Sequence, residues 1–179
     1  NAGEPHIKLP KPSRAFEIIS ADFAEHNGLS FLIITDWRSG WFSARPVKRK
    51  DAQTAILELR GFIADTAVPK YLYTDNGQPF PSAEFQDFLK RWGIQWISSS
   101  PFYPQSNTYA ENGVKSAKAL LKKCIVGKKM DYEEWDKGLL AIRNTPNKSG
   151  VSPAVFLYGH SVNEILPAHK KALQKSWHK

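Results

Sequence analysis

The stretch "FEIISADFAEHNGLSFLIITDW" (residues 16–37) decides the fold, because two strand patterns flank a strong turn signal. Its first eight residues alternate between apolar and polar side chains, as expected for a strand with one buried face. The dipeptide Asn27-Gly28 is a strong signal for a hairpin turn. The apolar run after it predicts a second, more buried strand, and a third is expected at 41–47. The chain therefore opens with a predicted antiparallel meander.

After the meander, helix and strand patterns alternate along the chain. Asp51, Ser82, Asp131 and Ser152 mark four of the helix starts, and Gly159 marks one helix end. The expected elements are helices at 52–66, 83–92, 108–126, 132–143 and 153–158, with strands at 70–75 and 93–99. The order β-β-β-α-β-α-β-α-α-α predicts an α/β fold in which one mixed sheet carries helices on its faces.

The length of 179 residues suits one globular domain with a substantial core. We expect a linker at 1–15, the core at 16–160 and a basic linker or tail at 161–179. The absence of an initiator Met suggests a piece of a longer protein. No apolar run approaches the roughly 20 residues that a membrane helix requires, so no membrane association is predicted.

Positive charge is concentrated in one part of the sequence. Residues 1–111 carry 12 basic and 12 acidic residues, whereas residues 112–179 carry 13 basic and 5 acidic residues. Such asymmetry is typical of a protein with a polyanionic partner, although an ordinary solvated surface explains it equally well. Cys124 is the only cysteine, and the histidines lack zinc-ligand spacing, so neither a disulfide within the chain nor structural zinc is expected.

Three carboxylates are candidates for a common site. Asp22 lies in the first strand, Asp75 ends the fourth and Glu111 begins the longest helix. If the first and fourth strands are neighbours, their aspartates lie close together, and three carboxylates without His or Cys suit Mg²⁺ or Mn²⁺. Simpler roles remain open: a turn for Asp75, a helix-dipole contact for Glu111. Asp36, at the end of the second strand, is an alternative to Asp22 as the first of the three carboxylates.

The spacing of these residues and three flanking motifs resemble a known family. Between Asp22 and Asp75 lie 52 residues, and between Asp75 and Glu111 lie 35. This resembles the D,D-35-E signature of retroviral and retrotransposon integrases. "TDNGQPF" is similar to the family's second-aspartate motif, and "SPFYPQSNTYAEN" to its catalytic loop and glutamate. "RNTPNKSGVSPAVFLYG" resembles a stretch that follows the core in Gypsy-class retrotransposon integrases.

The resemblance implies a ribonuclease H-like fold: a five-stranded mixed sheet, flanked by helices, whose second strand is antiparallel. It implies that Asp22, Asp75 and Glu111 are catalytic residues that hold two Mg²⁺ or Mn²⁺ ions. The implied activity is that of a polynucleotidyl transferase and endonuclease, which trims the 3′ ends of element DNA and joins them to target DNA. The implied partners are these DNAs and further copies of the chain, as a dimer or higher oligomer. The implied location is the nucleus, with virus-like particles or the cytoplasm as further places.

The sequence is open to two other interpretations. A domesticated core could bind nucleic acid or protein without catalysis, but three retained acids favour an active enzyme. A related transposase or ribonuclease H-type nuclease is disfavoured by the "RNTPNKSGVSP" stretch.

The longest predicted helix carries a basic stripe. At 100° per residue, Lys115, Lys118 and Lys122 follow Glu111 on one face, and an apolar stripe lies about 100° away. A helix pair between Glu111 and Lys115 would explain only two of these residues. In the family, lysines four and seven residues after the glutamate hold DNA, which implies this role for Lys115 and Lys118. The loop residues predicted to contact DNA are Gln105, Ser106 and Asn107.

Overall fold

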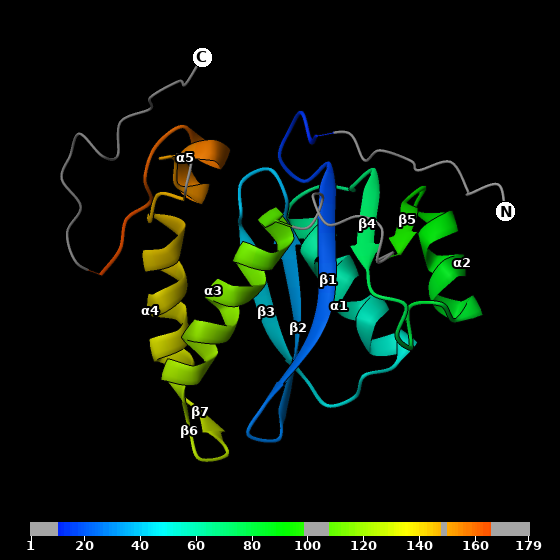
Figure 1. Cartoon of the computed structure of the whole chain (residues 1–179), viewed down its shortest axis with the longest axis horizontal. Coiled ribbons are helices and arrows are strands. Elements are labelled where there is room, and N and C mark those ends of the chain that lie inside the picture. The colour runs from blue at the N-terminus through cyan, green and yellow to red at the C-terminus, as the bar shows by residue number, and fades with distance from the viewer. Residues whose placement is uncertain (1–10, 99–107, 148–149, 166–179) are drawn as a thin grey trace, which may run out of the picture.

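The computed structural model describes residues 11–98, 108–147 and 150–165, and the side chains of residues 108–112 are outside this description. A five-stranded sheet forms its centre (Figure 1). The strands are β1 (Ile18–His26), β2 (Leu29–Asp36), β3 (Phe42–Val47), β4 (Tyr71–Thr74) and β5 (Gln95–Ser98). The helices are α1 (Ala52–Asp65), α2 (Ala83–Arg91), α3 (Thr108–Cys124), α4 (Tyr132–Arg143) and α5 (Pro153–Tyr158).

The strand order β3-β2-β1-β4-β5 gives the mixed sheet that the sequence predicts. The opening meander pairs antiparallel, whereas β4 joins β1 in parallel and β5 joins β4 in parallel. The second strand is therefore antiparallel to its neighbours, and the first and fourth strands are adjacent. This adjacency is the condition under which Asp22 and Asp75 are expected to meet.

Each face of the sheet packs against its own helices. Ile19, Leu32 and Ile34 face the core that includes Leu59 of α1 and Phe85 of α2. The alternate residues of the same strands face α3 and α4, whose apolar side chains form a second core. α3 contacts β1, β2 and β3, so it crosses the sheet face that carries the even-numbered residues of β1 (Figure 1).

The predicted helix caps are confirmed. The side chains of Asp51, Ser82, Asp131 and Ser152 each accept a hydrogen bond from a backbone N–H in the first helical turn. Gly159 ends α5 with a φ of 75°, a conformation that favours glycine. These local contacts explain why the helix starts were readable from sequence.

Several element boundaries differ from the sequence prediction by one to three residues, among them those of β1 and α3. β1 begins at Ile18 because Phe16 has a φ of 61°, outside the extended region, and the strand continues to His26. α3 ends at Cys124, two residues before the predicted end at residue 126. The chain then forms a short hairpin of β6 (Ile125–Val126) and β7 (Lys129–Met130) that was not predicted.

The "RNTP" stretch at the end of α4 joins separate parts of the fold. The Arg143 guanidinium lies 3.9 Å from the centre of the Trp41 ring. The Asn144 side chain accepts a hydrogen bond from the Val162 N–H and donates to the Val162 carbonyl and the Glu164 carboxylate. The stretch therefore holds the segment after α5 against α4. Within the described ranges, no helix combines the length and apolarity needed to span a bilayer.

Candidate functional site

Asp22 and Asp75 lie level with each other on adjacent parallel strands. The parallel register pairs Ile18 with Tyr71 and Ser20 with Tyr73. Two further steps along each chain reach Asp22, within β1, and Asp75, one residue beyond the end of β4. Side chains two residues apart in a strand share a face, so Asp22 points to the face covered by α3. Neighbouring strands are about 4.8 Å apart where they pair, so the two aspartates leave the paired segment side by side.

The environment of Asp22 is electrostatically unusual. Its pKa is raised above the ordinary aspartate value, first by burial and also by the negative charge of Asp75. The positive charge of Lys118 on α3 opposes this shift. The pKa effects show that Asp75 and Lys118 are both close enough to Asp22 to interact with its charge.

Asp75 also has the turn role that its sequence context allows. Its Oδ1 accepts a hydrogen bond of 2.9 Å from the Gly77 N–H. The residue is exposed, so its second oxygen is not needed for the fold. The turn contact orients the carboxylate rather than excluding it from a site.

Asp36 is a structural residue. It has no exposed surface, and its carboxylate accepts hydrogen bonds from the Phe16 N–H at 2.8 Å, the Arg38 N–H at 3.4 Å, the Ser39 N–H at 3.0 Å and the Ser39 hydroxyl at 2.6 Å. Burial raises the pKa of Asp36, while these hydrogen bonds lower it. Both oxygens are committed to these hydrogen bonds, so Asp22, not Asp36, is the candidate beside Asp75.

α3 presents the two stripes predicted from its sequence. Val114, Ala117, Leu121 and Cys124 pack into the core on this side of the sheet. Lys115, Lys118 and Lys122 are exposed. The helix thus presents a row of exposed cations that passes near Asp22.

Gly113 brings the first part of α3 close to the sheet, a feature missed from sequence. A Cβ at this position would clash with the side chain of Thr35 on β2, which is itself fully buried. Thr35 pairs with Ser20, two residues from Asp22 on β1. A glycine inside a helix, two residues after the candidate glutamate, was the available signal.

The remaining predicted site residues lie partly or wholly outside the description. Glu111 belongs to the first turn of α3, but its side chain is not described. Gln105, Ser106 and Asn107 lie outside the described residues. Among the described side chains, no group of three His, Cys, Asp or Glu residues could hold a metal ion. Two carboxylates of the predicted three are therefore brought together here.

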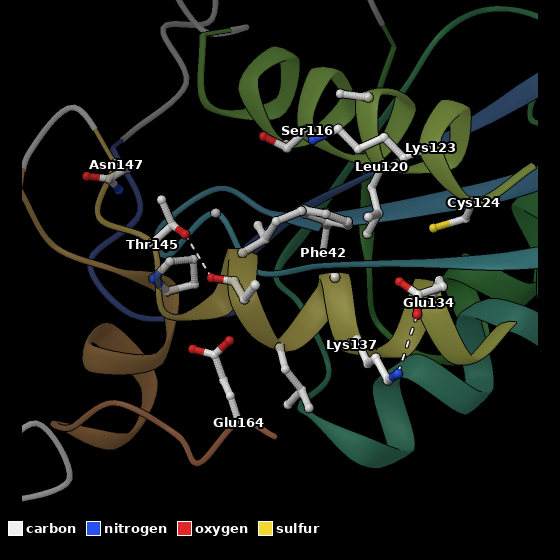
Figure 2. Close-up of a pocket in the computed structure, with 18 of the residues that line it drawn as sticks. Phe42, Ser116, Leu120, Lys123, Cys124, Glu134, Lys137, Thr145, Asn147 and Glu164 are labelled. Carbon is white, nitrogen blue, oxygen red and sulfur yellow. Dashed lines mark hydrogen bonds and ion pairs between the residues drawn. The ribbon is translucent and has the colours of Figure 1, made fainter. Parts of the chain in front are cut away.

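A cavity of about 1040 Å³ lies elsewhere, between α3 and α4. Figure 2 shows Ser116, Leu120 and Lys123 of α3 on one side and Glu134 and Lys137 of α4 on the other. Neither Asp22 nor Asp75 lines it. The paired aspartates therefore lie outside this cavity.

Comparison with known proteins decides the family. The chain matches the protein family described as "Integrase core domain" over residues 12–104, more than half of its length. The chain belongs to the integrase core domain family. The matched range contains Asp22 and Asp75 and ends before α3.

Relatives and solved structures agree with this assignment. This integrase core domain is 30% identical over 169 residues to the Pro-Pol polyprotein of simian foamy virus type 3 (strain LK3), and 29% identical over 172 residues to the Pol polyprotein of feline endogenous virus ECE1. These alignments cover 90% and 89% of this chain but only 15% and 16% of the relatives. The chain thus spans about a sixth of the length of these polyproteins.

Two solved structures share the fold. The catalytic core domain of BIV integrase superimposes with a TM-score of 0.65 at 19% identity, covering 79% of this chain and 94% of that one. A simian T-cell lymphotropic virus intasome, in complex with PP2A regulatory subunit B56 gamma, gives 0.73 at 22% identity, covering 91% and 62%. The ribonuclease H-like fold with its five-stranded mixed sheet is therefore confirmed.

The raised pKa of Asp22 predicts a pH dependence of stability without metal. In the pH range between the ordinary aspartate value, about 3.9, and the raised value, the folded state binds more protons than the unfolded state. The contribution of Asp22 to the free energy of unfolding therefore falls as the pH rises through that range. Urea unfolding in EDTA from pH 4 to 7 should show this fall for the wild type, relative to Asp22→Asn. Parallel pH profiles for the two proteins would contradict the burial of a charged Asp22.

Proposed function

We propose that this chain is the catalytic core of a Gypsy-class retrotransposon integrase that carries out DNA integration. Its reactions are metal-dependent trimming of element 3′ ends and transfer of those ends into target DNA. The observation that carries the proposal is the level placement of Asp22 and Asp75 on adjacent parallel strands. Membership of the integrase core domain family supports the reaction class.

The donor chemistry fits a divalent cation. Asp22 and Asp75 offer hard oxygen ligands, and the charge of Asp75 disfavours the charged form of Asp22. Among the described residues, neither His nor Cys joins them in a metal-binding group, which suits Mg²⁺ or Mn²⁺ over zinc. Two such ions, when bound, would activate the attacking oxygen and stabilise the leaving one.

Glu111 is the proposed third ligand, completing the D,D-35-E set. It lies seven residues before Lys118, so helical periodicity puts both on one stripe of α3. Lys118 acts on the charge of Asp22, so this stripe of the helix passes near Asp22. The close approach of Gly113 to β2 supports a position for the first turn of α3 near the same place.

The chain's own residues would also position the DNA. Lys115, Lys118 and Lys122 are exposed cations suited to the phosphate backbone. Gln105, Ser106 and Asn107 of the preceding loop are proposed to contact the DNA end. Further copies of the chain are proposed partners, and the nucleus is the proposed place of action.

The test is strand transfer, or its reversal on a branched DNA, by the purified chain with Mg²⁺ or Mn²⁺. Product should form with either ion and disappear when EDTA is added, then return when the ion is restored. A chain that binds the branched DNA but forms no product with either ion would favour the alternative, a domesticated core that binds nucleic acid without catalysis.

A further inference from the structure

The β6–β7 hairpin extends the basic stripe of α3 to the far end of the sheet. The hairpin follows α3 directly and carries Lys128 in its turn and Lys129 at the start of β7. Both lysines are exposed, as is Lys122 in the last turn of the helix. We call Lys128 and Lys129 the hairpin lysines.

The hairpin is held against the body of the fold. The Asn27 side chain, in the turn between β1 and β2, donates a hydrogen bond of 3.2 Å to the Gly127 carbonyl. The Asp131 N–H donates to the Cys124 carbonyl at 2.8 Å, which closes the base of the hairpin. Figure 1 shows this hairpin beside the β1–β2 hairpin at the lower end of the molecule. The hairpin lysines therefore have a defined place relative to β1, the strand that carries Asp22.

The charges of the hairpin lysines are not neutralised locally. Across the described ranges, neither forms an ion pair, and Lys122 forms none either. The nearby acids are engaged otherwise: Asp131 caps α4, and Glu133 and Glu134 pair with Lys137. The positive field at this end is therefore available to an external anion.

The geometry points to the phosphate backbone of duplex DNA as that anion: we propose that the hairpin lysines hold the DNA that continues beyond the reacting phosphate. From Lys115 to the end of α3 is about 14 Å at 1.5 Å per residue, and two hairpin residues add about 7 Å. This row of about 20 Å matches six nucleotide steps at 3.4 Å per strand. A row of exposed cations of that length suits a regular polyanion. The identity of the DNA as substrate rests on the proposed function.

The test is the double variant Lys128→Ala with Lys129→Ala, in binding to a 20-base-pair DNA duplex at several salt concentrations. The slope of log affinity against log salt is negative, and each lost phosphate contact should make it shallower by about 0.9. For the double variant the slope should therefore become shallower by about 2, and affinity at 0.1 M salt should fall at least tenfold. The matched control is Arg60→Ala with Lys90→Ala, which removes the same charge from exposed positions on α1 and α2.

The outcomes separate this proposal from the proposed function. If the hairpin variant and the control bind DNA with the same slope and affinity, the proposal is overturned. It is also overturned if a 20-base-pair RNA duplex binds more tightly than DNA and loses as much on substitution, because the surface would then be an RNA site. In strand-transfer assays the hairpin variant should raise KM with little change in kcat. If the wild-type chain has no strand-transfer activity, the proposed function is wrong. The DNA-binding measurements still decide whether the hairpin lysines hold DNA.

Discussion

Replacing Asp75 by Asn is expected to abolish metal-dependent strand transfer while the fold stays intact. Metal ions supply several kcal/mol of stabilisation to such reactions, so loss of a ligand should lower kcat at least about a thousandfold. Asp75 is exposed and its one described side-chain contact is to the Gly77 N–H, which an amide oxygen can also accept. Strand-transfer kinetics with Mg²⁺ measure the loss.

Two controls accompany the Asp75 variant. Thermal unfolding should match the wild type, and affinity for duplex DNA should stay within a fewfold. Asp22→Asn and Glu111→Gln should show the same loss of activity, whereas Asp87→Asn, on the exposed surface of α2, should keep full activity. Retention of activity by Asp75→Asn would show that Asp75 is only a turn residue.

Replacing Asp36 by Ala is expected to destabilise the protein by at least about 3 kcal/mol. The substitution leaves three backbone N–H groups and the Ser39 hydroxyl without their acceptor, and each unsatisfied buried group costs about 1–3 kcal/mol. Urea denaturation at pH 7 measures the free energy of unfolding. The comparison is Asp51→Ala, which removes a half-buried helix cap and should cost only about 1 kcal/mol.

The Asp36 and Asp22 variants should have opposite phenotypes. Asp36→Ala should lose stability but keep its specific activity per folded molecule at low temperature. Asp22→Asn should lose activity without losing stability. If Asp36→Ala were as stable as the wild type and inactive, the assignment of the two strand aspartates would have to be exchanged.

The sequence predicted most elements because their signals are local. The side chains of Asp51, Ser82, Asp131 and Ser152 cap helices through contacts only three residues long. The β6–β7 hairpin was missed because its strands have two residues each, and its apolar residues continue the pattern of α3. Gly127, with a φ of 64°, was the signal that ends the helix pattern there.

The site was predictable only as a set of candidates. Asp22 and Asp36 both lie in strands, and no local pattern distinguishes a buried acceptor of four hydrogen bonds from a half-buried carboxylate. The pairing of β1 with β4 joins residues more than 50 positions apart, so it could be stated only as a condition. The structure meets that condition, and it adds the contact between Gly113 and Thr35, which spacing alone does not reveal.

The most direct test of the central claim is a crystal of the chain soaked in Mn²⁺ and examined by anomalous diffraction. A peak between Asp22 and Asp75 is predicted, with a carboxylate oxygen of each within about 2.2 Å of the ion, near the distance typical of Mg²⁺ sites. A carboxylate oxygen of Glu111 should lie in the same coordination sphere or at a second ion about 3.5–4 Å away. No peak at this position, at an Mn²⁺ concentration that saturates the other carboxylates of the surface, would contradict the account.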